Sequence, residues 1–432
     1  MLEKLFKLSE HKTTVKTEVL AGVTTFMTMG YILIVNPLIL SKAGMDFGAL
    51  ITATALSAAI ATLFMAFFAN LPFALAPGMG LNAFFAYAVV IGMGYSWQFA
   101  LTAVFLEGII FLILTFFNIR EAIVNCIPIN LKHSISAGIG LFIAFIGLQN
   151  AGIIVNNDAT LVGLGSLASK PALIAIIGLI IAGVLHIKKV TGALIIAILV
   201  STIIAIPLGV ASLPQDLKFV SLPAPLSPIF FQFDFSKIFT LDMIIVLFTF
   251  LFVDMFDTVG TLVGVSSKAN MLDKDGKLPG VKMALFADAV GTTAGACLGT
   301  STVTTYVESA AGVSEGGKTG LTAFTVAILF LLALFLSPVF IMIPGAATSP
   351  ALIMVGIFMM SPFKKVEMDD FTEAIPAFLT LIMMPLAYSI SEGIVFGLVS
   401  YVLLKLLTGK VKEVSLVTII IAILFLLAKI FI

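Results

Sequence analysis

Residues 299–312 read Gly-Thr-Ser-Thr-Val-Thr-Thr-Tyr-Val-Glu-Ser-Ala-Ala-Gly and lie between two long apolar runs. Residues 300–306 are Thr, Ser, Val and Tyr, which favour an extended backbone over a helix. The small residues that follow suit a short helix beginning near Glu308. A strand that runs into a half-helix cannot face lipid, because its backbone polar groups would lack partners. The stretch therefore predicts a polar site buried within the membrane part of the protein, and a polar loop outside the membrane is the alternative.

The whole chain has the composition of a membrane protein. It has 432 residues, of which 60% are hydrophobic and 11% are charged, whereas about 25% of residues in soluble domains are charged. The formal net charge of zero indicates no particular partner, and nothing points to nucleic acid. The lysine-rich start, residues 1–16, lacks the apolar run and cleavage site of a signal peptide. Cys126 and Cys297 lie in or beside apolar stretches, so we expect free thiols, no metal and no cofactor.

The hydrophobic residues are grouped into segments that can cross about 30 Å of hydrocarbon. Twelve of them lie at 18–36, 48–69, 98–117, 133–152, 171–187, 190–210, 240–263, 281–298, 320–343, 346–361, 371–388 and 391–407. Two shorter, interrupted segments at 78–92 and 300–316 bring the predicted total to 14. A last run at 414–431 is either a further crossing or an interfacial helix. The sequence thus predicts an all-α polytopic membrane protein.

The lysines support this count and orient the chain. With the N-terminus in the cytoplasm, nearly all of the 23 Lys and Arg residues fall on the cytoplasmic side, as the positive-inside rule requires. The exceptions are Lys42, Lys170, Lys218, Lys237 and, if the last run crosses, Lys429. The fit needs both interrupted segments to cross the membrane.

The two halves of the chain resemble each other. A proline-rich stretch at residues 211–236 divides them after the seventh segment. Leu101-Thr102-Ala103 and Leu321-Thr322-Ala323 each open the fourth segment of a half, and these segments run in opposite directions. This pattern indicates an inverted-topology repeat.

The third segment is interrupted in both halves. In the first half, Pro77, Gly78 and Gly80 make a continuous helix unlikely until about Leu81. Corresponding breaks in two repeats point to a transport site near the middle of the membrane. Two unrelated kinked helices are the alternative.

Five acidic residues lie inside apolar segments, where a charge is costly and marks function by default. They are Glu107, Asp254, Asp257, Asp288 and Glu308. No Lys, Arg or His is expected at their depth, so these carboxylates must protonate, share a proton or bind a donor-rich ligand. This favours a neutral substrate rich in N–H groups that moves with a proton. It disfavours an anion such as sulfate or bicarbonate, although helix dipoles in such a site would suit one.

The acidic residues differ in the roles we expect. Glu308 lies at the start of a half-helix, whose N–H groups stabilise negative charge, and it leads the candidates together with Asp257. Asp254, three residues before Asp257, shares a helix face with it and is a further candidate for proton coupling. Asp288 is expected to brace this helix or the strand, with a possible part in proton coupling. Glu107 is expected to bond within the first half.

The motifs of the two breaks resemble those of a known family. Residues 304–313 (TTYVESAAGV) and 315–320 (EGGKTG), with residues 254–260 and 76–85, resemble the signature of the AzgA-like purine permeases, a branch of the nucleobase:cation symporter-2 family. The resemblance extends to about Thr408. It implies 14 helices in two inverted repeats of seven, with short β-strands in segments 3 and 10. It also implies uptake of guanine, hypoxanthine or adenine with protons across the cell membrane, by a homodimer.

The resemblance also implies a domain division. The core domain would comprise residues 1–126 and 239–343, and the gate domain residues 127–212 and 344–413. Residues 213–238 would form an extracellular linker, and residues 414–432 are an additional apolar segment outside the family's pattern.

The family's site residues match positions in this chain. Asp257 and Glu308 match the carboxylates of the eighth and tenth helices, and both are candidates for substrate binding and proton coupling. Phe84, which is otherwise a core residue, matches an aromatic that stacks on the base. The remaining substrate-binding candidates are Asn82 in the first break and the backbone of Tyr306 and Val307. Related uracil carriers have a histidine one turn after the first carboxylate, where this chain has Thr261.

Two other classes of function remain to be weighed. An intramembrane aspartyl protease also uses two aspartates, but they face each other from separate helices, whereas Asp254 and Asp257 share one helix. The sequence therefore predicts no enzyme. An anion carrier of the same inverted-repeat architecture is the alternative among transporters.

Overall fold

The computed structural model describes residues 2–116, 128–211, 220–268, 271, 278–416, 418–420, 422–423 and 426. In the first half, the elements are α1 (Leu2–Phe6), α2 (Val15–Met29), α3 (Ile32–Ser41), α4 (Phe47–Phe64), η1 (Met65–Ala69), β1 (Leu75–Pro77), α5 (Met79–Ala83), η2 (Phe84–Gly92), α6 (Trp97–Phe116), α8 (Ile129–Asn150), β2 (Ile154–Asn157), β3 (Leu161–Leu164), α9 (Lys170–Ile187) and α10 (Ala193–Ala205). In the second half, they are α11 (Leu241–Lys268), α12 (Val281–Leu298), β4 (Val303–Thr305), α13 (Ser309–Ser314), α14 (Gly320–Ala333), η3 (Leu334–Leu336), α15 (Ser337–Ile341), α16 (Gly345–Met359), η4 (Ser361–Lys365), α17 (Phe371–Leu386), α18 (Ile390–Leu407) and η5 (Val411–Glu413).

The fold is all-α and polytopic, as the sequence predicts. Within the described ranges, eight helical runs are long and apolar enough to cross a membrane, and three apolar helices are shorter. Each of the 14 predicted segments coincides with a helix or with a strand and helix in succession. Cys126 and half of the residues of the run at 414–431 lie outside the described residues, so the predictions on them are not tested. Cys297 is a free thiol.

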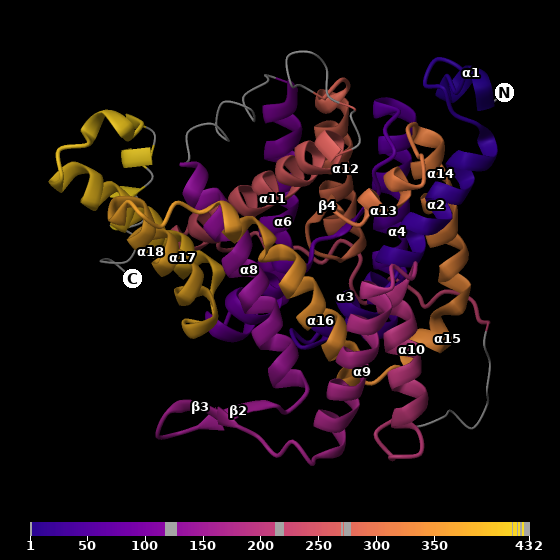
Figure 1. Ribbon diagram of the computed structural model, residues 1–432, viewed down its shortest axis with the longest axis horizontal. Coiled ribbons are helices and arrows are strands. Elements are labelled where there is room, and N and C mark those ends of the chain that lie inside the picture. Colours follow the sequence, from indigo (N-terminus) through magenta and orange to yellow (C-terminus); the bar gives the residue numbers. More distant parts are fainter. Residues whose placement is uncertain are drawn as a thin grey trace.

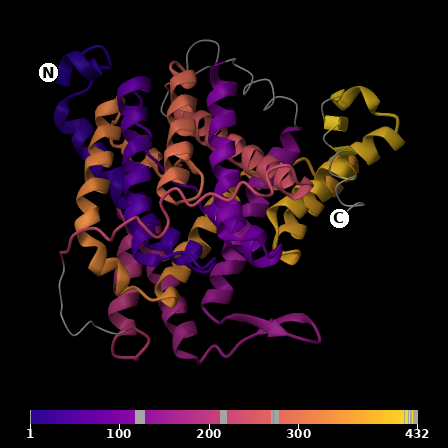
Figure 2. The ribbon, with the colours of Figure 1, turned by 180° about the vertical axis from the view of Figure 1, so that it is seen from behind.

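The helices form two groups by their contacts. Helix α4 packs on α3, α12 and α14, and α6 packs on α12, whereas α8 packs on α16 and α17, and α17 on α18. Figures 1 and 2 show α17 and α18 at one side of the molecule and α2 and α14 at the other, with β4 and α13 between them. This grouping resembles the predicted core and gate domains, whose boundaries stay a prediction.

A strand directly precedes the first interrupted segment and another lies in the second, and the two strands pair with each other. Strands β1 and β4 are antiparallel and fully buried, with Ala76 opposite Thr304. The pairing extends beyond the strands, because Gly78 N–H donates to Thr302 C=O at 2.9 Å and Tyr306 N–H donates to Ala74 C=O at 3.0 Å. Each break thus supplies backbone partners to the other, which is how extended backbone is tolerated at membrane depth.

A threonine from a flanking helix completes each strand. Thr62 of α4 donates to Leu75 C=O at 3.1 Å and accepts from Leu75 N–H at 3.0 Å. Thr292 of α12 does the same for Val303, at 2.9 and 3.2 Å. The two breaks are therefore built alike, in agreement with the predicted repeat.

The helix after β1 begins earlier than the sequence predicts. It starts at Met79, not near Leu81, with Gly78 in an extended conformation as its N-cap. Gly80 lies in the first turn, where it serves packing, since a Cβ there would lie 2.6 Å from Cγ2 of Ile139 on α8. The glycine reflects close contact between two helices and not the end of a break.

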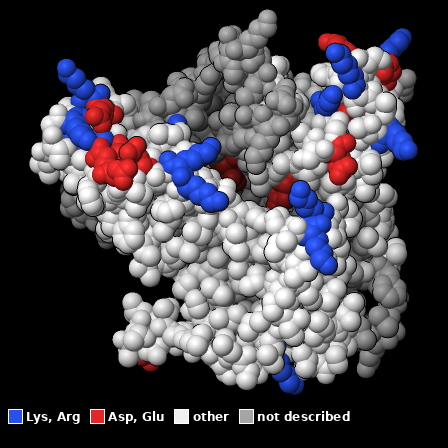
Figure 3. All heavy atoms as spheres, in the orientation of Figure 1, with Lys and Arg blue, Asp and Glu red and all other residues white. Residues whose placement is uncertain are grey.

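Basic residues gather at one end of the molecule. Figure 3 shows Lys and Arg mainly along the upper edge, which is also where the N-terminus lies in Figure 1. The opposite end carries the β2–β3 hairpin. This asymmetry agrees with the predicted topology, in which the basic end is cytoplasmic, and the orientation itself stays a prediction.

Candidate functional site

Glu308 lies in the second break, where α13 contacts α2. It is the N-cap residue of α13, as the sequence predicts. Its Oε1 accepts a hydrogen bond of 2.6 Å from the Tyr31 hydroxyl, and its carbonyl accepts one of 3.4 Å from Thr28 Oγ1. The Glu308 side chain is thus held at the N-terminal end of a half-helix by a neutral donor.

Asp257 approaches the same point from α11. This helix contacts both β4 and α13, and the Asp257 carboxylate lies close enough to Glu308 and Asp288 to interact with them electrostatically. Both Asp257 and Glu308 remain partly accessible. The structure therefore brings together the two carboxylates that lead the sequence prediction.

No cation accompanies these two carboxylates in the part of the chain that the structure describes. None of its ion pairs involves Asp257 or Glu308, and it holds no cluster of His, Cys, Asp and Glu suited to a metal ion. Thr261, which replaces the histidine of related uracil carriers, is 9% exposed. Figure 3 shows acidic atoms on the floor of a hollow in this face of the molecule.

Tyr306 joins the two breaks, whereas the side chain of Val307 is exposed. The Tyr306 hydroxyl donates to the Pro77 carbonyl at 2.5 Å, and its N–H is engaged by Ala74. The Tyr306 N–H is therefore unavailable to a ligand in this conformation. The Val307 side chain is 49% exposed although its neighbours in β4 are buried.

Asn82 and Phe84 are covered by protein atoms. The Asn82 side chain accepts a hydrogen bond from the Ser301 hydroxyl, and its buried Nδ2 has no partner among the described residues. The Phe84 ring is 1% exposed and packs edge-on against Phe250, with ring centroids 4.9 Å apart and an interplanar angle of 71°. Stacking of Phe84 on a base stays a prediction, and in this conformation the ring face is not open.

Asp254 and Asp288 belong to a buried network centred on Thr258. The Thr258 hydroxyl lies 2.7 Å from Asp288 Oδ1, 3.3 Å from Asp254 Oδ1 and 2.8 Å from Thr304 Oγ1. Because both aspartates are completely buried, they contact helix and strand and do not face the hollow. The bracing role expected of Asp288 agrees with this geometry.

Glu107 makes a hydrogen bond to the second half of the chain. Its Oε2 accepts a hydrogen bond of 2.5 Å from the Thr302 hydroxyl. This contact arises because α6 packs on α12, which brings Glu107 beside the second break, and the expected bond within the first half stays a prediction.

Sequence reasoning misses two residues of this region. Tyr31 follows Gly30 within an apolar run, and one aromatic among apolar residues carries no signal of its own. Thr258 lies four residues after Asp254 and one after Asp257. A hydroxyl one helical turn after a carboxylate can bond to it, and this spacing is the signal in the sequence.

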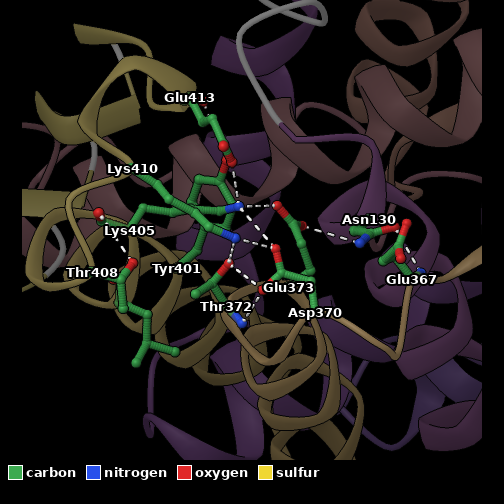
Figure 4. Close-up of polar contacts among 11 residues, drawn as sticks. Asn130, Glu367, Asp370, Thr372, Glu373, Tyr401, Lys405, Thr408, Lys410 and Glu413 are labelled. Carbon is green, nitrogen blue, oxygen red and sulfur yellow. Dashed lines mark hydrogen bonds and ion pairs between the residues drawn. The ribbon is translucent and has the colours of Figure 1, made fainter.

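A second polar cluster, which we call the Lys405 cluster, lies where α8 and α17 begin and α18 ends. Figure 4 shows Lys405 and Lys410 among the carboxylates of Asp370, Glu373 and Glu413. Lys405 Nζ is 2.7 Å from Glu373 and 2.6 Å from Glu413, and Lys410 Nζ is 2.5 Å from Asp370. A cavity of about 500 Å³ borders the cluster.

Comparison with known proteins shows what the chain is similar to. The sequence profile of a family described as Permease family matches residues 16–396. A protein of Methanocaldococcus jannaschii described as a permease is 50% identical over 98% of this chain and 97% of its own length. The adenine permease AdeP of Escherichia coli is 46% identical over 100% of this chain and 96% of its own. The guanine/hypoxanthine permease PbuO of Bacillus subtilis is 44% identical over 98% of both chains.

Solved structures show the fold. The transmembrane domain of the cyanobacterial bicarbonate transporter BicA aligns with a TM-score of 0.65 over 88% of this chain and 96% of that chain. Its sequence identity is 17%, so this similarity concerns the fold alone.

Proposed function

This chain belongs to the permease family, and we propose that it imports purine nucleobases together with protons. The family assignment confirms the resemblance noted in the sequence and makes the chain a multi-pass membrane transporter, not an enzyme. The identity of the cargo rests on relatives described as adenine and guanine/hypoxanthine permeases, which are 44–46% identical over nearly their full lengths.

The observation that carries the proposal is the pair Asp257 and Glu308, which lie where two broken helices meet and form no ion pair with any described residue. A purine is neutral and offers N–H donors at its edges, which suit carboxylate acceptors. An anion would bring a third negative charge to this point, which like-charge repulsion disfavours. The pair thus supports a purine over an anion.

The proposed mechanism follows from these groups. The N–H groups of the base donate to Asp257 and Glu308, and one carboxyl carries the coupled proton, with Asp254 and Asp288 assisting its transfer. The membrane potential supplies about 2.3 kcal/mol per charge per 100 mV, or roughly 50-fold accumulation per proton. Movement of the core domain against the gate domain then exposes the site to each side in turn.

The proposal includes the architecture that this mechanism needs. It comprises 14 crossings in two inverted repeats of seven, a cytoplasmic N-terminus, a homodimer, and the core and gate boundaries given above. The alike construction of the two breaks, with Thr62 and Thr292 in matching positions, supports the repeat.

The alternative is an anion carrier of the same architecture. It is favoured by the fold of BicA, a bicarbonate transporter, whose identity of 17% argues for fold only. Purified protein in liposomes, with an inward proton gradient and labelled hypoxanthine, separates the two. We expect competition by unlabelled adenine, guanine or hypoxanthine and none by uracil or sulfate. Absence of proton-driven hypoxanthine uptake, together with uptake of labelled sulfate by the same liposomes, would reject the proposal.

A further inference from the structure

Tyr31 lies at a break in the first membrane segment. The segment Val15–Ser41 is divided at Gly30 and Tyr31 into α2 and α3. Pro37 in α3 has no N–H to bond the carbonyl of Leu33 four residues earlier, which weakens the helix at this point. Tyr31 thus lies between α2 and α3, next to the second break.

The position of the Tyr31 hydroxyl is tightly defined. The side chain is 1% exposed, so its ring cannot swing into solvent. A Cβ on neighbouring Gly30 would lie 3.0 Å from Ile195 of α10, which leaves this turn little space to move. The hydroxyl lies 2.6 Å from Glu308 Oε1, the length of a strong hydrogen bond to a carboxylate.

This hydrogen bond occupies one of the two oxygens of Glu308. A carboxylate with two free oxygens accepts two parallel N–H donors equally well, whereas the phenol already fills one lone pair of Oε1 and leaves Oε2 as the stronger acceptor. Because the Tyr31 side chain is buried, its hydroxyl cannot leave Oε1 for water. Glu308 thereby becomes a weaker acceptor at Oε1 than at Oε2.

We propose that Tyr31 is a positioning residue that determines specificity by weakening one of the two acceptor oxygens that Glu308 offers to the substrate. The inference rests on the proposed purine transport. Guanine carries adjacent N1–H and 2-amino donors that match a free carboxylate at two points, whereas hypoxanthine has N1–H alone at that edge. Tyr31 therefore favours bases with one donor at this edge over bases with two.

The test is Tyr31→Phe, which removes the hydroxyl and keeps the ring. We expect the ratio of the guanine KM to the hypoxanthine KM to fall about tenfold, the lower end of what a hydrogen bond to a charged group contributes. The matched control is Tyr401→Phe, which removes a hydroxyl that donates to the Glu413 carbonyl in the Lys405 cluster. The control should leave the ratio unchanged.

The possible results distinguish a failure of this inference from a failure of the proposed purine transport. A Tyr31→Phe ratio equal to that of the wild type, or KM values that change by one common factor, overturns the inference and leaves purine transport standing. A wild-type protein that takes up neither base overturns both. If the phenylalanine variant is missing from the membrane, Tyr31→Met, which also lacks the hydroxyl and fills apolar space, is measured in its place.

Discussion

The central carboxylates and the Lys405 cluster show two opposite ways in which acidic groups are stabilised in this protein. At the centre, Glu308 is held by the Tyr31 hydroxyl, and the described residues provide no ion pair for it or for Asp257. In the Lys405 cluster, Glu373 and Glu413 share one lysine that is 1% exposed. The difference separates carboxylates that hold helices together from carboxylates that can exchange their hydrogen-bond partners.

The physical basis is the cost of changing partners. Removing one member of a buried ion pair leaves an uncompensated charge, so the Lys405 cluster is suited to holding elements together. It joins the N-terminal ends of α8 and α17 to the end of α18, because Asn130 also donates to Glu373 Oε2 at 3.1 Å. A carboxylate held by hydroxyls can instead accept a proton or a substrate N–H without breaking an ion pair.

The largest effect is expected from neutralising the central carboxylates. Asp257→Asn and Glu308→Gln each replace an acceptor and proton carrier with an amide, so uptake of labelled hypoxanthine should fall by more than about 100-fold, or roughly 3 kcal/mol. Quantified protein in the membrane should match the wild type. Asp158→Asn in the exposed hairpin is the control and should transport normally. Near-normal proton-driven uptake by either central variant would remove these residues from the site.

The next effect concerns stability and not transport. Lys405→Met leaves Glu373 and Glu413 without their buried cation, and we expect a loss of about 3 kcal/mol in unfolding free energy, at the lower end of the range because Glu413 is 52% exposed. Thermal unfolding of the purified protein measures it, and the KM of the remaining folded protein should be unchanged. Adding Glu373→Leu should recover part of the loss. A double variant that is less stable than the single one would contradict the ion-pair explanation.

The sequence predicts the elements of the centre better than their contacts. Composition and polar interruptions place the second strand and Glu308 correctly, because lipid tolerates so few backbone conformations, whereas the first strand is implied only by the family resemblance. The bond from Thr302 to Glu107 and the contact of Gly80 with α8 depend on how helices far apart in the chain approach each other. Tyr31 is missed for the same reason, since its partner Glu308 lies 277 residues later.

A smaller effect on transport should follow from Thr258→Val, which keeps the side-chain shape but removes the hydroxyl between Asp288 and Thr304. The lost hydrogen bond to a buried carboxylate should slow uptake by about tenfold, or 1.4 kcal/mol. Thr249→Val on the same helix is the control, because that hydroxyl donates within its own helix, to the Ile245 carbonyl. Equal rates for the two variants would show that the network around Thr258 has no part in transport.

The smallest effect belongs to the exposed edge of the Lys405 cluster. The hydrogen bond from the Lys410 ammonium, followed by those from Thr372, holds the pKa of Asp370 well below its ordinary value. A carboxylate with a lowered folded-state pKa contributes stability above its unfolded pKa of about 4 and loses it as the pH falls toward the folded value. Lys410→Gln should therefore lower the melting temperature slightly at pH 7, and the difference from the wild type should shrink as the pH falls below about 4. Melting curves from pH 7 to pH 3 measure this, and a difference that stays constant with pH would mean that Lys410 does not act through Asp370.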